Sequence, residues 1–138
     1  MITPADIIQT VRVPNTNSVF FLGCFENRVT LYSQQVRALN LVDAILDQQL
    51  VREHGKVAIV GGGAAGITAA AALAKTAPAL QKIDLFEARS DILEFQHRSS
   101  RYLHPHIYDW PGPGTDRLDA GLPILNWQAG PAGKALST

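Results

Sequence analysis

Residues 56–66 of the chain read KVAIVGGGAAG, and residues 83–87 read IDLFE. The apolar run that opens the first stretch leads directly into closely spaced glycines, after which an alanine-rich sequence follows. A proline stands at position 78, and the residue before a proline avoids the helical conformation, so we expect a helix over residues 64–77. The second run predicts a strand over residues 82–87, parallel to the first and joined to it by a right-handed crossover. The pattern predicts an α/β protein with a βαβ unit within residues 56–95.

Each glycine of this unit has a distinct physical role. Gly61 permits the tight turn from strand to helix, Gly63 leaves room for a pyrophosphate to approach the backbone, and Gly66 lets the helix lie close to the sheet. The first helical turn, at Ala64, Ala65 and Gly66, presents unpaired backbone N–H groups at the positive end of the helix dipole. These features predict a site for the two phosphates of a dinucleotide. A glycine-rich turn that binds nothing is the alternative.

An acidic residue, Glu87, ends the second strand 21 positions after Gly66. At this spacing a carboxylate accepts hydrogen bonds from the ribose hydroxyls of an adenine dinucleotide. The same carboxylate would repel a 2′-phosphate, so FAD or NAD is favoured over NADP. Arg89 lies two residues further on and could accommodate that phosphate, which leaves NADP as an alternative.

The sequence VAIVGGGAAGITAA at residues 57–70, with LFEAR at residues 85–89, resembles a known family segment. It is similar to the N-terminal, Rossmann-like FAD/NAD(P)-binding segment of flavoprotein oxidoreductases with two dinucleotide-binding domains, a group that includes amine oxidases, flavin monooxygenases and disulfide reductases. The resemblance implies that the three spaced glycines bind the pyrophosphate of FAD and that Glu87 binds its ribose. Amine oxidases usually place a glycine pair a few residues later, whereas residues 92–95 read ILEF here.

The composition indicates a globular protein of the cytoplasm. Twelve basic and twelve acidic residues give no net charge, so no overall field attracts nucleic acid or a membrane surface. The single cysteine, Cys24, excludes an internal disulfide and is expected to be a small buried residue rather than a nucleophile. The N-terminus lacks the pattern of a secretory signal. Residues 57–74 carry no charge, but the βαβ interpretation accounts for their glycines, so no membrane span is predicted.

Residues 1–55 are interpreted as an extension that precedes the βαβ unit. Two β-prone runs, at residues 19–22 and 28–32, are separated by a glycine and polar residues and predict a β-hairpin. Ser33 can cap an amphipathic helix that continues to about Glu53 and ends at a following glycine. We expect this extension to contribute packing.

Residues 96–138 form a loop-rich C-terminal segment. Five of the chain's eight prolines lie here, together with tyrosines and tryptophans that favour ordered loops over a disordered tail. The stretch at residues 97–106 contains Arg98 and Arg101 and no acidic residue. It could face the cofactor phosphates or an anionic substrate, and a solvated loop is the alternative.

Histidines of this segment suggest two further kinds of chemistry. No cysteine or carboxylate joins His97, His104 and His106 at a familiar metal-ligand spacing, so we predict no metal site. His106 and Asp109 are candidates for acid–base chemistry, although an Asp-Trp-Pro sequence more often forms a turn. The sequence therefore assigns no catalytic residue.

The length of the chain limits what it can do. Only two strands of a parallel sheet are visible in 138 residues, whereas flavoproteins of the kind described above need much longer chains. We therefore expect a truncated part of an FAD-dependent oxidoreductase, inactive alone, that holds the ADP half of FAD while an unknown small-molecule substrate is bound elsewhere. A minimal module that completes its sheet in a homo-oligomer is the alternative to truncation. A second functional hypothesis is a non-catalytic module that binds NAD(H) or another adenine nucleotide.

Overall fold

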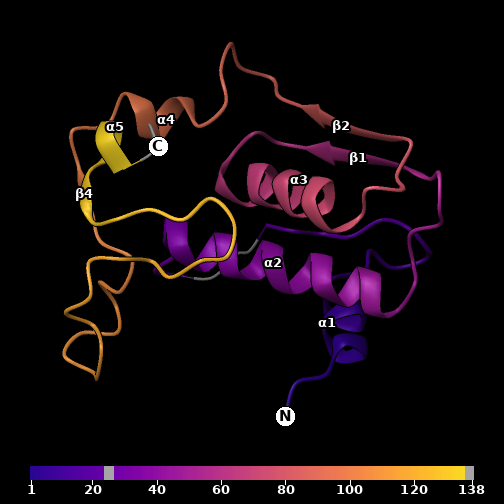
Figure 1. Ribbon diagram of the computed structural model, residues 1–138, viewed down its shortest axis with the longest axis horizontal. Coiled ribbons are helices and arrows are strands. Elements are labelled where there is room, and N and C mark those ends of the chain that lie inside the picture. Colours follow the sequence, from indigo (N-terminus) through magenta and orange to yellow (C-terminus); the bar gives the residue numbers. More distant parts are fainter. Residues whose placement is uncertain (24–26, 136–138) are drawn as a thin grey trace.

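The computed structural model describes residues 1–23 and 27–135, so Cys24 and the prediction made for it lie outside the described residues. Figure 1 shows the elements in layers, with the strand pair β1 and β2 uppermost, α3 beneath it and then α2 and α1. The mixed α/β fold predicted from the sequence is confirmed. In chain order the elements are α1 (Pro4–Val11), α2 (Leu31–Asp47), β1 (Lys56–Val60), α3 (Ala64–Thr76), β2 (Lys82–Phe86), α4 (Glu94–His97), β3 (Tyr102–Leu103), β4 (Gly130–Pro131) and α5 (Ala132–Ala135).

β1 and β2 form a parallel pair. Lys56 is aligned with Lys82 at one end of the register, and Val60 is aligned with Phe86 at the other. The ladder continues for one more residue, because the N–H of Gly61 donates to the carbonyl oxygen of Phe86 at 2.8 Å. The second strand and the helix before it agree with their predicted bounds to within one residue.

α3 covers one face of this strand pair. Its buried residues Ala69 and Ala72 belong to a core cluster against which Val57 and Ile83 of the strands pack. The alanine side chains are short, so the helix axis can lie close to its neighbours. This explains why the sequence places so many alanines in this helix.

The other face of the strand pair is open. Val60 and Phe86, side by side at the carboxyl ends of the two strands, are 87% and 56% exposed. Parallel sheets are normally covered on both faces. The described part of the chain therefore supplies one of the two layers that usually enclose such a sheet.

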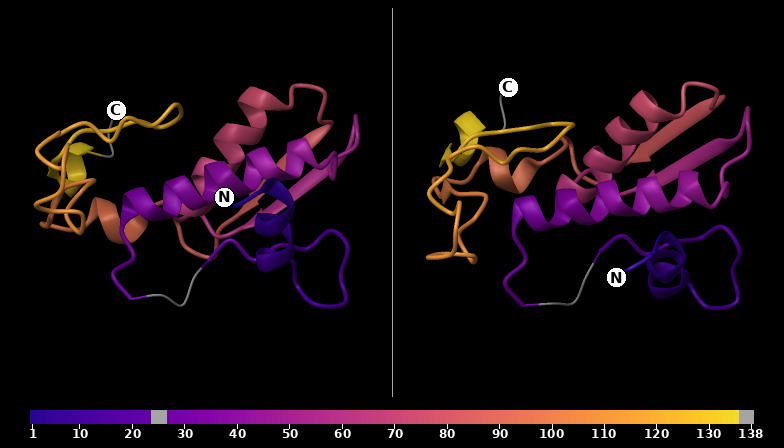
Figure 2. Two further views of the ribbon diagram at one scale, coloured as in Figure 1. Left: turned by 90° about the horizontal axis from the view of Figure 1, so that it is seen from below. Right: turned by 60° about the horizontal axis from the view of Figure 1, so that its bottom comes forward.

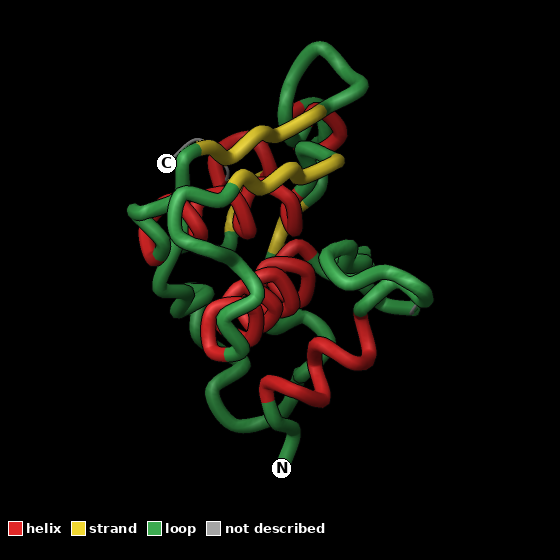
Figure 3. Tube along the Cα trace, turned by 90° about the vertical axis from the view of Figure 1, so that its right-hand side faces the viewer, coloured by secondary structure: helices red, strands yellow, loops and turns green. Residues whose placement is uncertain are grey.

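α2 lies between α3 and α1, as the views in Figure 2 show. On one side, Ala38 and Val42 pack with the alanines of α3. On the other side, Leu41 and Ile45 pack with Ile8 of α1. Figure 3 shows the same order of layers from the side. The long helix thus has two apolar faces, which agrees with its predicted packing role.

The predicted β-hairpin before this helix is wrong. Among the described residues, Phe20 forms an isolated antiparallel bridge with Arg12, and Leu31 already belongs to α2. The reason is a capping box at the helix start. The backbone N–H groups of Thr30 and Ser33 each donate to the other residue's hydroxyl oxygen at 2.9 Å. This cap overrides the β propensity of the run, and it places Ser33 inside the helix rather than before it.

The end of α2 also differs from the prediction. The helix ends at Asp47, six residues before Glu53. Gln49 then adopts a left-handed conformation with φ of 51°. This turn lets the N–H of Leu50 donate to the carbonyl oxygen of Ile45 at 3.0 Å. A left-handed glutamine therefore ends the helix, rather than the glycine that the sequence indicates.

No helix within residues 1–23 and 27–135 is long and apolar enough to cross a lipid bilayer. The uncharged stretch at residues 57–74 is divided between β1 and α3. The glycine turn separates the two elements, as the βαβ interpretation predicts.

The C-terminal segment is loop-rich, as predicted, and lies beyond the carboxyl ends of β1 and β2 (Figure 1). Its anchor is Trp127, which is 5% exposed and donates its indole N–H to Oε1 of Gln35 at 2.7 Å. The side-chain amide of Gln35 donates to the carbonyl oxygen of Leu125 at 3.0 Å. One buried glutamine on α2 therefore holds a loop that follows it by about ninety residues.

Candidate functional site

The turn between β1 and α3 has the backbone geometry that the glycine spacing predicts. Gly61 has φ of +106°, a conformation that side chains disfavour. A Cβ built on Gly66 would collide with the carbonyl oxygen of Gly61. Glycine at these two positions therefore lets the first turn of α3 approach the end of β1.

Gly63 stands at the point where α3 begins. It is the N-cap residue, and no side chain caps the helix there. A Cβ built on Gly63 would meet nothing within 4 Å, so the space in front of it is open. The first N–H with a helical partner is that of Ile67, which donates to the carbonyl oxygen of Gly63 at 3.0 Å. The amides of the preceding turn have no carbonyl partner in the helix, which is the arrangement that binds anions.

Glu87 lies immediately after β2, and its carboxylate is joined to the glycine turn. The N–H of Gly62 donates to Oε2 of Glu87 at 2.5 Å, and the N–H of Arg89 donates to Oε1 at 2.9 Å. These hydrogen bonds, from Arg89 first and Gly62 second, lower the pKa of the Glu87 carboxyl below its ordinary value. The group is therefore ionised at neutral pH. A carboxylate can accept about four hydrogen bonds, so it retains the capacity to accept from ribose hydroxyls.

Gly62, which the sequence analysis did not single out, is enclosed by the residues that follow β2. A Cβ on Gly62 would lie 2.9 Å from Oε2 of Glu87 and 3.0 Å from Cγ2 of Ile92. Its carbonyl oxygen accepts a hydrogen bond from the N–H of Leu93 at 3.0 Å. The sequence signal for this role is the glycine at position 62 itself. The fingerprint requires glycine at positions 61 and 63, and it allows any residue between them.

Leu93 has φ of 53°, in the left-handed region that favours glycine. The backbone thus has a glycine-like conformation at a position where this sequence has leucine. The Leu93 side chain is buried, 8% exposed, so its packing contributes to holding this conformation.

The Arg89 side chain contacts two residues of α4. The carbon at the centre of its guanidinium lies 4.0 Å from the centroid of the Phe95 ring. Its Nη1 also lies 3.5 Å from Oε2 of Glu94. Glu94 is shared, because Nη2 of Arg98 lies 3.3 Å from its other oxygen. This cluster has no recognisable motif in the sequence and was not predicted.

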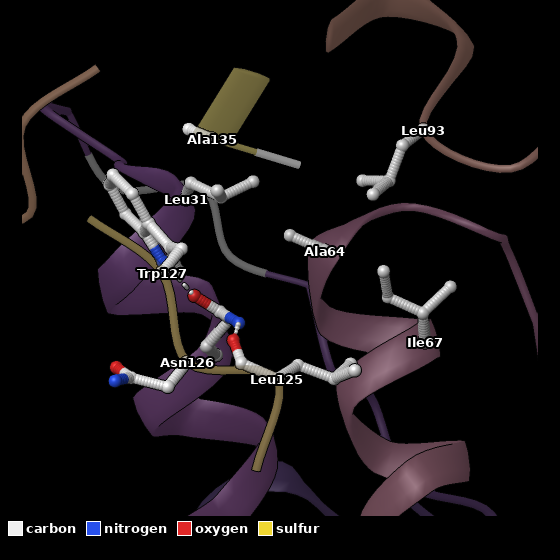
Figure 4. Close-up of a pocket in the computed structure, with 9 residues that line it drawn as sticks. Leu31, Ala64, Ile67, Leu93, Leu125, Asn126, Trp127 and Ala135 are labelled. Atoms are coloured by element: carbon white, nitrogen blue, oxygen red, sulfur yellow. Dashed lines mark hydrogen bonds between the residues drawn. The ribbon is translucent and has the colours of Figure 1, made fainter. Parts of the chain in front are cut away.

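A small cavity lies beside the first turn of α3. Its volume is about 60 Å³, far below the 300–1,000 Å³ typical of ligand pockets. Figure 4 shows Ala64, Ile67 and Leu93 on one side of it and Leu31 and Trp127 on the other. The cavity is therefore a gap between packed elements, whereas a Cβ on Gly63 would point into space that is open for at least 4 Å.

The predicted site residues fall into three groups, one of which is Arg89 at α4. Gly61, Gly63, Ala64, Ala65, Gly66 and Glu87 are brought together at the carboxyl end of β1 and β2. Arg101 lies in the C-terminal segment, just before β3. Its backbone N–H donates to Oγ of Ser99 at 3.2 Å, and its carbonyl oxygen accepts from the N–H of Ala132 at 2.9 Å.

Two of the three histidines of the C-terminal segment, His104 and His106, lie next to each other. The rings of His104 and His106 have centroids 6.1 Å apart, and Nε2 of His106 lies 3.2 Å from the carbonyl oxygen of Asp119. The N–H of Asp109 donates to the carbonyl oxygen of His106 at 3.1 Å, as in a turn. The described ranges contain no group of three histidine, cysteine or acidic side chains placed to hold a metal ion.

Comparison with known families agrees with this geometry. Residues 59–132 match the family model of an NAD(P)-binding Rossmann-like domain, which is more than half of the chain. The chain belongs to this family. The matched part of the Rossmann-like domain includes the glycine turn, Glu87 and α4, and it supports a dinucleotide cofactor. Comparisons with curated proteins and with solved structures found no match.

Proposed function

We propose that this Rossmann-like domain binds the ADP half of FAD and serves as the cofactor-binding part of an FAD-dependent oxidoreductase. The observation that carries the proposal is the hydrogen bond between Gly62 and Glu87, 2.5 Å long. It places an ionised carboxylate next to the uncapped start of α3. A donor for phosphate oxygens and an acceptor for ribose hydroxyls are thus adjacent, as an ADP moiety requires.

The pyrophosphate would lie in front of Gly63. The space there is open, and the amides of the first turn of α3, at Ala64, Ala65 and Gly66, lack helical acceptors. The partial positive charge of the helix N-terminus adds to their attraction for phosphate oxygens. These residues bind and orient the cofactor and do not themselves carry out redox chemistry.

The ribose would lie against Glu87. Its carboxylate is held by backbone N–H groups on the side of the glycine turn, which leaves lone pairs for hydroxyl donors. A 2′-phosphate would bring a second anion to the same place. FAD or NAD is therefore favoured over NADP.

Bound FAD would supply hydride or electron transfer through its isoalloxazine ring. Among the described residues we identify no surface that would enclose this ring, and the face of the sheet next to Val60 and Phe86 is open. We therefore infer that redox turnover requires further protein, either in the same polypeptide or in another copy of the chain. The substrate and the catalytic residues would belong to that part.

The second candidate is a non-catalytic module that binds NAD(H) or another adenine nucleotide. The observation that favours it is the family match, which names NAD(P) rather than FAD. The same turn and the same carboxylate would hold the ADP half of either cofactor.

An absorption spectrum and a stability measurement separate the two candidates. We would purify the 138-residue chain with added FAD, remove free ligand by gel filtration and record the visible flavin band. A retained flavin band, or thermal stabilisation by FAD but not by NAD, supports the flavoprotein proposal. Colourless protein that NAD stabilises and FAD does not would support the second candidate.

A further inference from the structure

We propose that the guanidinium of Arg89 forms a stacking surface for the adenine ring of the bound dinucleotide, and that Phe95 and Glu94 hold it in position. This inference rests on the proposed function, because it requires an ADP moiety whose ribose lies at Glu87. It adds a base-recognition role that neither the glycine fingerprint nor the family match assigns.

Arg89, Phe95 and Glu94 form a cluster whose geometry suits stacking. The guanidinium carbon of Arg89 lies 4.0 Å from the centroid of Phe95, which is a stacking distance. The Arg89 side chain is 50% exposed, so Phe95 covers part of it and the rest faces solvent. A planar cation with one face on an aromatic ring offers its other face to a second flat π system.

Arg89 also lies close to the proposed ribose site at Glu87. The backbone N–H of Arg89 donates to Oε1 of Glu87 at 2.9 Å, so the two residues share one turn of the chain. In a nucleoside the base is attached to C1′, the carbon next to the one that carries the 2′-hydroxyl. A ribose bound at Glu87 therefore places its base within one sugar ring of this turn. An arginine two residues later is long enough to reach it.

The charge of Arg89 is partly neutralised by Glu94. Nη1 of Arg89 lies 3.5 Å from Oε2 of Glu94, and Arg98 contacts the other oxygen of the same carboxylate. Glu94 has a side chain only 14% exposed, so it is a fixed partner rather than a mobile surface acid. Arg89 is thus partly neutralised and oriented toward α4. This arrangement suits stacking on a neutral base, whereas capture of a 2′-phosphate would require Arg89 to leave both partners.

The test uses the full 138-residue chain and titrations of ADP and UDP followed by amide chemical shifts in NMR spectra, which report weak binding. Arg89→Lys keeps the charge and removes the planar face. Phe95→Ala removes the support beneath it. Tyr102→Ala is a matched control, because Tyr102 is 67% exposed and Phe95 is 68% exposed. Circular dichroism of each variant checks that the fold is retained.

We expect Arg89→Lys to weaken ADP binding about fivefold to tenfold and UDP binding less, because uracil offers a smaller stacking surface. Phe95→Ala should give a smaller loss in the same direction, and Tyr102→Ala should match the wild type. Unchanged ADP affinity in Arg89→Lys, or an equal loss for ADP and UDP, would overturn the stacking role. Glu87→Ala tests the ribose site of the proposed function separately from the stacking role of Arg89, since it removes the ribose contact for both nucleotides. If the wild type binds neither nucleotide, the proposed function itself fails.

Discussion

The carboxylate of Glu87 accepts a hydrogen bond from the backbone N–H of Gly62 at 2.5 Å and thereby joins the end of β2 to the turn after β1. These residues are 25 positions apart in the sequence. The link fixes the acidic group beside the start of α3, where the helix has no side-chain cap. An acceptor for ribose and donors for phosphate are therefore present in the same small region of the fold.

Gly63→Val should abolish ADP binding while leaving the fold intact. Gly63 has extended backbone angles, φ of −79° and ψ of −177°, which valine adopts without strain. Its side chain would enter the open space assigned to the pyrophosphate. NMR titration with ADP measures the loss, and circular dichroism checks the fold. Equal affinity in wild type and variant would show that the phosphates bind elsewhere.

Gly66→Ala provides the contrast to that variant. Its Cβ would collide with the carbonyl oxygen of Gly61, so either the turn or α3 must shift. We expect a loss of folding free energy of about 1–3 kcal/mol, as for other overpacked sites. Urea unfolding followed by circular dichroism gives the value. A variant as stable as the wild type would contradict the close packing of helix and turn.

Glu87→Ala should weaken ADP binding by at least about tenfold. The variant loses hydrogen bonds to an ionised acceptor, which are stronger than hydrogen bonds between neutral groups. Glu53→Ala serves as the control, because Glu53 is an exposed acid outside the βαβ unit. Calorimetric or NMR titration of both variants measures the effect. If the two variants bind alike, Glu87 is only a structural link between β2 and the glycine turn.

At acidic pH the carboxylate of Glu87 should lose its contribution to the free energy of unfolding. Its pKa in the folded state is lowered from the ordinary value of 4.5, chiefly by the N–H of Arg89. A group with a depressed pKa contributes stability above its unfolded pKa and loses that contribution as the pH falls through the folded pKa. We therefore expect Glu87→Gln to be less stable than the wild type at neutral pH. The difference should disappear in acid below the ordinary carboxyl range. Urea unfolding as a function of pH measures it, and a difference that does not depend on pH would contradict this account.

Gln35→Leu should destabilise the protein through the C-terminal segment. The substitution leaves the buried indole N–H of Trp127 without its acceptor, and unsatisfied buried donors cost about 1–3 kcal/mol. Asn40→Leu on the same helix changes an exposed residue and should alter stability by no more than about 0.5 kcal/mol. Tryptophan fluorescence during urea unfolding reports on both. If Gln35→Leu and Asn40→Leu unfold at the same urea concentration, the loop that contains Trp127 is held by other contacts.

The sequence predicted the βαβ unit well because each of its signals is local. Three signals lie within about thirty residues of one another. They are an apolar run, glycines that the backbone conformation requires, and an acidic residue at the end of the second strand. Their positions follow from steric limits on the backbone, and these limits do not depend on the rest of the fold. The bounds of α3 and β2 accordingly agreed to within one residue.

The predictions outside this unit were poorer for physical reasons. The end of the β-prone run is helical because Thr30 and Ser33 cap α2. The helix ends early, at Asp47, and Gln49 follows in a left-handed conformation. The contact between Gln35 and Trp127 joins residues 92 positions apart. The orientation of Arg89 depends on Phe95, a side chain without a sequence motif. Such features depend on tertiary packing, which periodicity in one sequence does not reveal.

The most direct test of the central claim is a competition experiment with FAD. Binding of FAD labelled with carbon-14 in its adenine is followed by equilibrium dialysis against the 138-residue chain, and unlabelled ADP or FMN is then added. Since the glycine turn and Glu87 are assigned to the ADP half, we expect ADP to displace FAD and FMN to have no effect. Displacement by FMN but not by ADP would contradict the account, because the flavin end of the cofactor would then be the part that the chain holds.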